Sequence, residues 1–172
     1  MYYGSIKNTD IANGTGVRVS LFVSGCTNRC KGCFQPETWD FCYGSEFDEQ
    51  ARKSILDMLK PDYISGLSVL GGEPFEPANQ PELCDFLTTV KKVYPAKDIW
   101  VFTGFTLEEL LKDGSYARTK FTDIMLNLID VMVDGRFEED KKDISLKFRG
   151  SSNQRIIDLK PSLKNGSVFT LS

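Results

Sequence analysis

Apolar runs of strand length alternate with segments of helical spacing along most of this 172-residue chain, and this alternation limits the folds that it can adopt. The runs long enough for strands are residues 17–23, 67–70, 99–103, 131–134, 144–148 and 168–171. Helical spacing predicts helices over residues 48–59, 80–93, 107–112 and 121–129, the first with Asp48 as its N-cap. Such alternation indicates βαβ units and an α/β fold with a mainly parallel sheet. No repeat or long linker interrupts the pattern, so we expect a single domain over residues 1–172.

A motif containing glycine follows each of the first four predicted strands. GCTNRCKGC comes after the first, GGEP after the second, TGF after the third and DGR after the fourth. The carboxyl ends of parallel strands meet at one edge of a sheet, which is where α/β proteins bind their ligands. We therefore expect the four motifs to form one site.

The strongest chemical signal is a group of three cysteines. Cys26, Cys30 and Cys33 follow the pattern C-x3-C-x2-C. Thiolates at this spacing on one loop can hold three corners of a [4Fe-4S] cubane, leaving one iron open to a ligand. The pattern predicts that S-adenosylmethionine binds that iron through its amino and carboxylate groups. An electron from the reduced cluster would then cleave the sulfonium, releasing methionine and a 5′-deoxyadenosyl radical.

A structural zinc site is the main alternative for these cysteines. A closed zinc site needs four ligands, usually arranged as two spaced pairs. The chain has no histidine, and only Cys42 and Cys84 remain, neither at zinc-finger spacing. We interpret both as ordinary small apolar residues.

The GGEP motif predicts a second part of the same site. Paired glycines let a backbone approach a ligand closely and expose its polar groups. Gly72 and Glu73 offer acceptors for the methionyl ammonium of S-adenosylmethionine. A simple turn at the end of a strand would use the same residues, and only the neighbouring cysteines favour the ligand.

The later motifs carry weaker predictions. The hydroxyl of Thr103 could bind ribose, and Asp134 with Arg136 could organise charge near the methionyl carboxylate. Phe34, directly after the third cysteine, could contact adenine or pack in the core. The polar stretch RGSSNQR, residues 149–155, could line the mouth of the site or form a loop and a helix cap.

Charge and hydropathy exclude other broad classes of function. The net charge is −3 and the pI is about 5.1, which predicts no broad nucleic-acid surface. No apolar run approaches the ~20 residues needed to span a bilayer, so we expect no membrane association. The odd number of cysteines and the polar first residues predict a cytoplasmic protein without a disulfide framework.

Taken together, the motifs resemble the glycyl-radical activases of the radical S-adenosylmethionine superfamily, in the branch that activates anaerobic (class III) ribonucleoside-triphosphate reductase. The resemblance covers nearly the whole chain. It runs through DIANG, LFVSGCTNRCKGCFQPETW, LGGEPFEPAN, KDIWVFTGF and DVMVDGRF to FRGSSNQR. The cysteine triplet marks the superfamily, whereas RGSSNQR and the short length select this branch. Gly32 replaces the aromatic residue found before the third cysteine in much of the superfamily, and a glycine there suits this branch.

The resemblance implies an incomplete (β/α) barrel with its cluster at the carboxyl edge of the strands. On matching positions it assigns the cluster to Cys26, Cys30 and Cys33. It assigns the adenosyl part of S-adenosylmethionine to Gly32, Cys33 and Phe34, and the methionyl amine to Gly72 beside Glu73. Asp134 and Arg136 would place charge near the methionyl carboxylate.

The implied reaction is the removal of an α-hydrogen from a glycine of the partner reductase by the 5′-deoxyadenosyl radical. A flavodoxin-type donor would supply the electron, and no general base is needed, which agrees with a chain lacking histidine. Two alternatives remain open. One is another radical S-adenosylmethionine enzyme, acting on a different glycyl-radical enzyme or on a small molecule, although a small molecule would more often need a longer chain to enclose it. The other is a non-catalytic iron–sulfur or zinc module.

Overall fold

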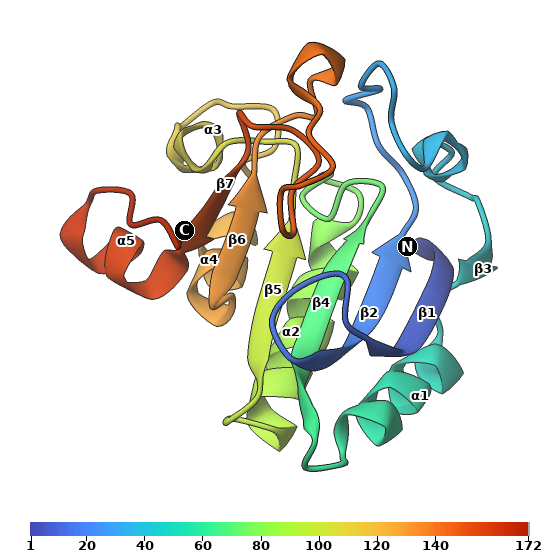
Figure 1. Ribbon diagram of the computed structural model, residues 1–172. Helices are drawn as coiled ribbons and strands as arrows, with labels where there is room; N and C mark the ends of the chain where they lie inside the picture. Colours follow the sequence, from blue (N-terminus) through green and yellow to red (C-terminus); the bar gives the residue numbers. More distant parts are fainter. Residues whose placement is uncertain (172) are drawn as a thin grey trace.

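A computed structural model describes residues 1–171, which form one mixed sheet with helices packed against it (Figure 1). The sheet has seven strands in the order β3-β1-β2-β4-β5-β6-β7. Their bounds are β1 Tyr2–Asp10, β2 Val17–Val23, β3 Ser45–Glu46, β4 Ile64–Gly71, β5 Asp98–Phe102, β6 Val131–Asp134 and β7 Arg155–Asp158.

Parallel pairing is confined to the centre of the sheet. The neighbours β2, β4, β5 and β6 are parallel, whereas β1, β3 and β7 are antiparallel to the strands beside them. The prediction of an α/β fold is confirmed, but the sheet is partly rather than mainly parallel. The reason is that both edges are made by strands that enter without a crossover helix, and such strands pair antiparallel.

Helices α1 to α4 match the four predicted helices closely, whereas α5 was not predicted. The helices are α1 Glu49–Leu59, α2 Gln80–Val93, α3 Leu107–Leu111, α4 Thr122–Leu128 and α5 Leu159–Asn165, with short 3₁₀ helices η1 Pro36–Trp39 and η2 Glu139–Lys141. Asp48 caps the N-terminus of α1 as predicted, since its carboxylate accepts a hydrogen bond of 2.9 Å from the N–H of Ala51.

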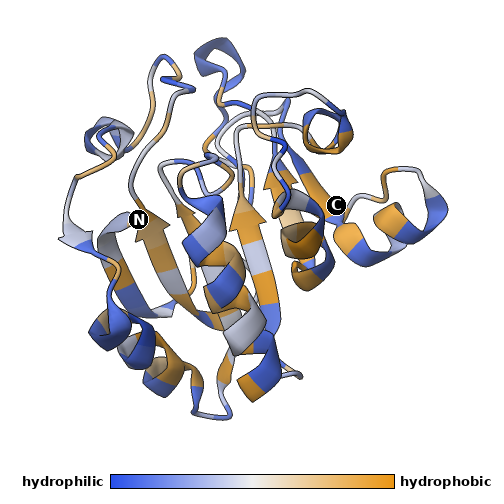
Figure 2. Cartoon of the chain, turned by 180° about the vertical axis from the view of Figure 1, so that it is seen from behind, coloured by the Kyte–Doolittle hydropathy of each residue, from blue (hydrophilic) through white to orange (hydrophobic). Residues whose placement is uncertain are grey.

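The main core lies between the sheet and the helices on one of its faces. Figure 2, which views the molecule from behind, shows helices in front of the sheet with apolar faces turned toward it. One fully buried row, in register across the four parallel strands, consists of Leu21, Val69, Val101 and Met132. The opposite face carries the alternate side chains and is covered by loops instead of helices, which leaves space for a site.

Two predicted strands are wrong, and three strands of the structure, β1, β3 and β7, were not predicted. Residues 144–148 form turns, and Ile144 is 93% exposed. Residues 168–171 make only a bridge of Thr170 to Ile157, along the outer edge of β7. The three antiparallel strands β1, β3 and β7 lack a long apolar run, because strands at and next to the edges of this sheet bury fewer side chains than the central ones. In residues 1–171, no helix combines the length and the apolar character needed to cross a bilayer.

Candidate functional site

A cavity of about 590 Å³ lies at the carboxyl end of the parallel strands, on the sheet face that has no helices. Residues from all four predicted motifs line it, among them Cys26, Gly72, Gly104 and Gly135. The structure therefore confirms that the motifs after β2, β4, β5 and β6 meet in one place.

The cysteine loop leaves β2 and folds back over the cavity. Its base is held by the N–H groups of Gly25 and Cys26, which donate to the carbonyl oxygens of Thr38 and Trp39 at 2.7 and 3.3 Å. Two residues allow the reversal: Arg29 has a φ of 46° and Gly32 a φ of 77°. These turns place the loop so that all three of its cysteines line the cavity: Cys26, Cys30 and Cys33.

Burial shifts two of the three loop thiols toward their neutral form. All three are free and half-buried. Burial, followed by the nearby charge of Glu73, raises the pKa of Cys26 to about 11. Burial also raises the pKa of Cys30, although a hydrogen bond from the backbone of Phe137 opposes it. Protonated thiols must lose their protons to bind iron, so cluster assembly releases protons here.

The positions of the other two cysteines argue against a closed zinc site. Cys42 is exposed, which its interpretation as an apolar packing residue did not predict, and Cys84 is buried on α2 as expected. Neither lines the cavity. Within residues 1–171, no three Cys, Asp or Glu side chains are arranged to hold a single metal ion. A cubane holds its thiolates farther apart than one ion does, so a three-cysteine cavity wall fits the cluster better.

Glu73 joins three of the four motifs. Its carboxylate is 1% exposed and accepts hydrogen bonds from the backbone of Phe75 (2.8 Å) and Gly104 (2.7 Å), the hydroxyl of Thr103 (2.7 Å) and the amide of Asn28 (3.1 Å). These donors satisfy it as an anion, yet burial raises its pKa to about 7. Glu73 thus fastens the cysteine loop and the loop after β5 to its own turn.

Thr103 lines the cavity with its hydroxyl already engaged. The hydroxyl donates to Glu73 and accepts from the N–H of Phe105 at 3.1 Å. Its place in the wall is as predicted, but in this arrangement the hydroxyl holds the wall and is not free for a ribose.

The close approach at Gly72 is to the protein's own backbone. A Cβ at this position would lie 2.7 Å from the carbonyl oxygen of Gly25 and 2.9 Å from that of Thr38. The N–H of Gly72 donates to Val23 at 2.7 Å. Gly72 lines the cavity, and its lack of a side chain is explained by packing beneath the cysteine loop.

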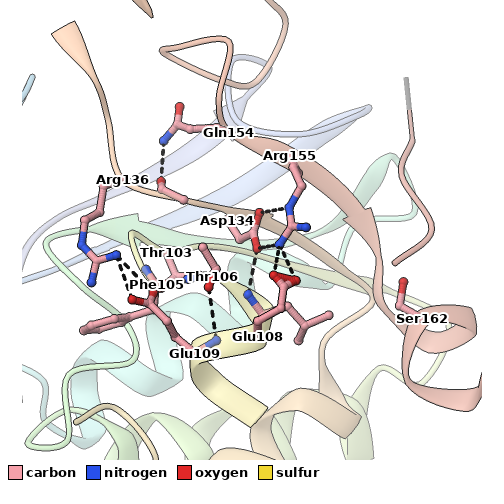
Figure 3. A network of polar contacts seen from close by, with 12 residues as sticks. Thr103, Phe105, Thr106, Glu108, Glu109, Asp134, Arg136, Gln154, Arg155 and Ser162 are labelled. Carbon is pink, nitrogen blue, oxygen red and sulfur yellow. Dashed lines mark hydrogen bonds and ion pairs between the residues drawn. The ribbon is translucent and has the colours of Figure 1, made fainter. Parts of the chain in front are cut away.

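Asp134 and Arg136 do not line the cavity. Asp134 is 1% exposed, accepts from the N–H of Leu107 at 2.8 Å and pairs with Arg155 at 2.6 Å (Figure 3). Arg136 pairs with Glu109 at 3.1 Å, and its guanidinium lies 5.3 Å from the centre of the Phe105 ring. The structure therefore gives both residues bonds that join β6 to α3, away from the cavity.

Of the two residues that flank Cys33, Phe34 lines the cavity and Gly32 does not. Phe34 is 66% exposed, lines the cavity and packs against Phe137, with 5.1 Å between ring centres. Gly32 does not line the cavity, and a side chain there would meet Glu139. Phe34 is therefore an accessible aromatic surface rather than a core residue.

Two asparagines at the site escaped prediction. Asn28 connects the cysteine loop to Glu73, and the buried amide of Asn79 donates to the carbonyl oxygens of Ser24 and Glu73 at 3.0 and 3.1 Å. Asn28 lies in GCTNRC and Asn79 in EPAN, so their place within these stretches was the only feature of the sequence that could have indicated a role at the site.

Comparison with known proteins identifies a family. Residues 12–157 match the model of the 4Fe-4S single cluster domain. Over 158 residues the chain is 46% identical to the anaerobic ribonucleoside-triphosphate reductase-activating protein of Pasteurella multocida, an alignment that covers 91% of this chain and 96% of that protein. It is 40% identical to the Escherichia coli K12 protein of the same name, covering 93% of this chain and all of that one. The bacteriophage T4 protein of that name is 36% identical, with 91% and 93% covered.

Proposed function

Because the chain belongs to the family of anaerobic ribonucleoside-triphosphate reductase-activating proteins, with their 4Fe-4S domain, we propose that it makes a glycyl radical on such a reductase by reductive cleavage of S-adenosylmethionine. One observation supports this proposal most directly: of five cysteines, the three in the C-x3-C-x2-C loop line the cavity and the other two do not.

In this proposal, Cys26, Cys30 and Cys33 hold the cluster through three thiolates. When bound, the cluster supplies one electron to S-adenosylmethionine and so provides a 5′-deoxyadenosyl radical. The residues of the chain bind and orient S-adenosylmethionine and shield the radical formed from it. Phe34 offers a ring surface for adenine, and Gly72 a backbone approach for the methionyl group, since both line the same cavity. Glu73 and Thr103 keep that wall in place through their mutual hydrogen bond.

The cavity's position also favours the incomplete (β/α) barrel of the superfamily. A barrel encloses its site on the sheet face opposite its helices, and the cavity lies on that face. An open side would admit a segment of another protein, so we propose the reductase as the substrate and a flavodoxin-type protein as the electron donor.

Deuterium transfer tests the proposal. The reconstituted protein is mixed with dithionite, S-adenosylmethionine and a reductase deuterated at its glycines. We expect deuterium in the 5′-deoxyadenosine and a glycyl radical in the electron paramagnetic resonance spectrum. Deoxyadenosine that forms at the same rate without deuterium and without a protein radical would show that the enzyme acts on another substrate. Failure to cleave S-adenosylmethionine, with the cluster present, would leave only a non-catalytic iron–sulfur module.

A further inference from the structure

One wall of the cavity is a long segment outside the sheet, residues 136–150, called here the cover segment. Figure 1 shows it in orange and red, folded across the upper front of the sheet. Its residues Phe137, Lys142, Ile144, Phe148, Arg149 and Gly150 line the cavity. Apart from the short helix η2 and one antiparallel bridge of Lys142 to Ser151, it consists of turns, bends and irregular backbone, so its position against the sheet depends on how its two ends are held.

Three consecutive side chains hold those ends. Strands β6 and β7 pair antiparallel, with Asp134 opposite Arg155, and backbone pairing stops there. The guanidinium of Arg155 binds the Asp134 carboxylate at 2.6 and 3.0 Å. The amide of Gln154 donates to the carbonyl oxygen of Gly135 at 2.9 Å, and the amide of Asn153 to that of Arg136 at 2.8 Å. The residues Asn153-Gln154-Arg155, called here the clasp, therefore bind Asp134-Gly135-Arg136 in reverse order. Figure 3 shows the bonds made by Gln154 and Arg155.

Gln154 binds both ends of the cover segment at once. While its amide nitrogen holds Gly135, its amide oxygen accepts from the N–H groups of Gly150 and Ser151 at 2.8 and 3.2 Å. Its own carbonyl oxygen accepts from the guanidinium of Arg149 at 2.8 Å. One side chain thus closes a loop of nineteen residues, and Arg155 extends the hold to α3 through Glu108 at 2.9 Å.

The held segment contacts the cysteine loop. Phe137 packs on Phe34, and the ammonium of Lys142 lies 5.4 Å from the centre of the Phe34 ring. A Cβ on Gly150 would lie 3.0 Å from both the Phe34 and the Phe137 rings, so the pair packs closely against this glycine. A shift at the clasp is therefore passed to Phe34, the neighbour of Cys33.

We infer that Asn153, Gln154 and Arg155 are positioning residues. They hold the cover segment against the cysteine loop, so that the wall of the cavity stays fixed while the hydrogen atom is transferred. This inference rests on the proposed function. A wall that moves would let solvent or the wrong hydrogen donor quench the radical. The clasp should therefore govern how many molecules of S-adenosylmethionine are cleaved for each glycyl radical formed.

The test compares Gln154→Leu with wild type in reconstituted protein. The matched control is Asn165→Leu, which removes an exposed amide with one local bond to Pro161 on α5. We expect Gln154→Leu to raise amide hydrogen exchange at Gly150 and Ser151 about 10-fold, and to raise the ratio of deoxyadenosine to glycyl radical several-fold, at equal iron content. Asn165→Leu should leave both measurements unchanged.

The inference is wrong if Gln154→Leu shows the same amide hydrogen exchange and the same ratio of deoxyadenosine to glycyl radical as Asn165→Leu. It is also wrong if the glycyl radical decreases only in proportion to the fraction of folded protein, because a purely structural role predicts that result. If Gln154→Leu does not fold, Asn153→Ala, which removes a single hydrogen bond, should show the same two effects at about 3-fold. A wild-type protein that cleaves S-adenosylmethionine but forms no glycyl radical would refute the proposed function instead, and the exchange measurement would still test the clasp.

Discussion

At the scale of single residues, several charged side chains near the site are already paired with other groups of the chain. Arg136 pairs with Glu109, Arg155 with Asp134, and Glu73 is satisfied by four donors from the chain itself. A buried charge without such partners would cost several kcal/mol, so this mutual pairing is the expected outcome. Among the predicted site residues that line the cavity, the groups left for a ligand are the thiols, the Phe34 ring and backbone atoms.

The cysteines carry the first prediction at this scale. Cys26→Ala, Cys30→Ala or Cys33→Ala should abolish the cluster, because each removes one of three thiols facing the cavity. Iron content and the visible absorption of the reconstituted protein measure this. Cys42→Ala and Cys84→Ala are the controls and should keep the iron, since neither thiol lines the cavity. Full iron in a loop variant would contradict the ligand assignment.

At the scale of elements, the turn after β4 supports the cysteine loop from below. The N–H groups of Gly72 and Glu73 donate to the carbonyl oxygens of Val23 and Gly25 at 2.7 and 2.8 Å, which joins the end of β4 to the start of the loop. Asn79, just before α2, adds a bond to Ser24. The position of the cysteines therefore depends on an element distant in sequence.

Gly72→Ala tests this dependence. The added methyl would meet the carbonyl oxygens of Gly25 and Thr38, which are backbone atoms and cannot rotate away. We expect a loss of about 1–3 kcal/mol in unfolding free energy and reduced iron content, although no ligand is removed. Urea unfolding and iron analysis measure the two effects. Gly114→Ala adds its methyl to open space, but at a φ of 81°, so it strains the backbone away from the cysteine loop and should keep its iron. Equal iron in both variants would show that the turn can relax.

At the scale of the whole molecule, the two faces of the sheet are built differently. One face is an apolar core under helices. The other contains Arg18, which is completely buried beneath the loop between β1 and β2. Its guanidinium binds the Ser68 hydroxyl at 2.7 Å, the carbonyl oxygens of Thr15 and Leu67 at 3.0 Å, and the Asp98 carboxylate at 2.7 Å. Arg18 thus joins β2, β4, β5 and the loop at the end of the sheet opposite the cysteines.

We predict that Arg18→Met lowers the unfolding free energy by about 2–4 kcal/mol. Met can fill the space, but it leaves acceptors on β4, on β5 and in the loop between β1 and β2 without their donor. Arg118→Met is the control, because Arg118 pairs with the exposed carboxylates of Asp113 and Asp123 and its loss should lower the unfolding free energy much less. Both values come from urea unfolding. A similar loss in the two variants would mean that the buried network does not hold this face together.

The amino-acid sequence by itself determined the features that depend on neighbours along the chain. The four central strands, helices α1 to α4 with the Asp48 cap, and the gathering of motifs at one sheet edge follow from periodicity and from the geometry of βαβ units. The cysteine spacing likewise identified which three thiols share a loop, because that depends only on chain connectivity.

Only the tertiary structure decided what depends on contacts between distant segments. The antiparallel edges, the bonds that occupy Asp134, Arg136 and Thr103, and the reason for Gly72 all involve partners that local pattern does not reveal. The same holds for RGSSNQR, whose polar side chains are readable in sequence but whose partners, Asp134-Gly135-Arg136, lie across an antiparallel strand pair. A hydrogen bond needs a donor and an acceptor at a short distance from each other. The sequence shows each of these groups, but it does not show which distant group lies close enough to bind it.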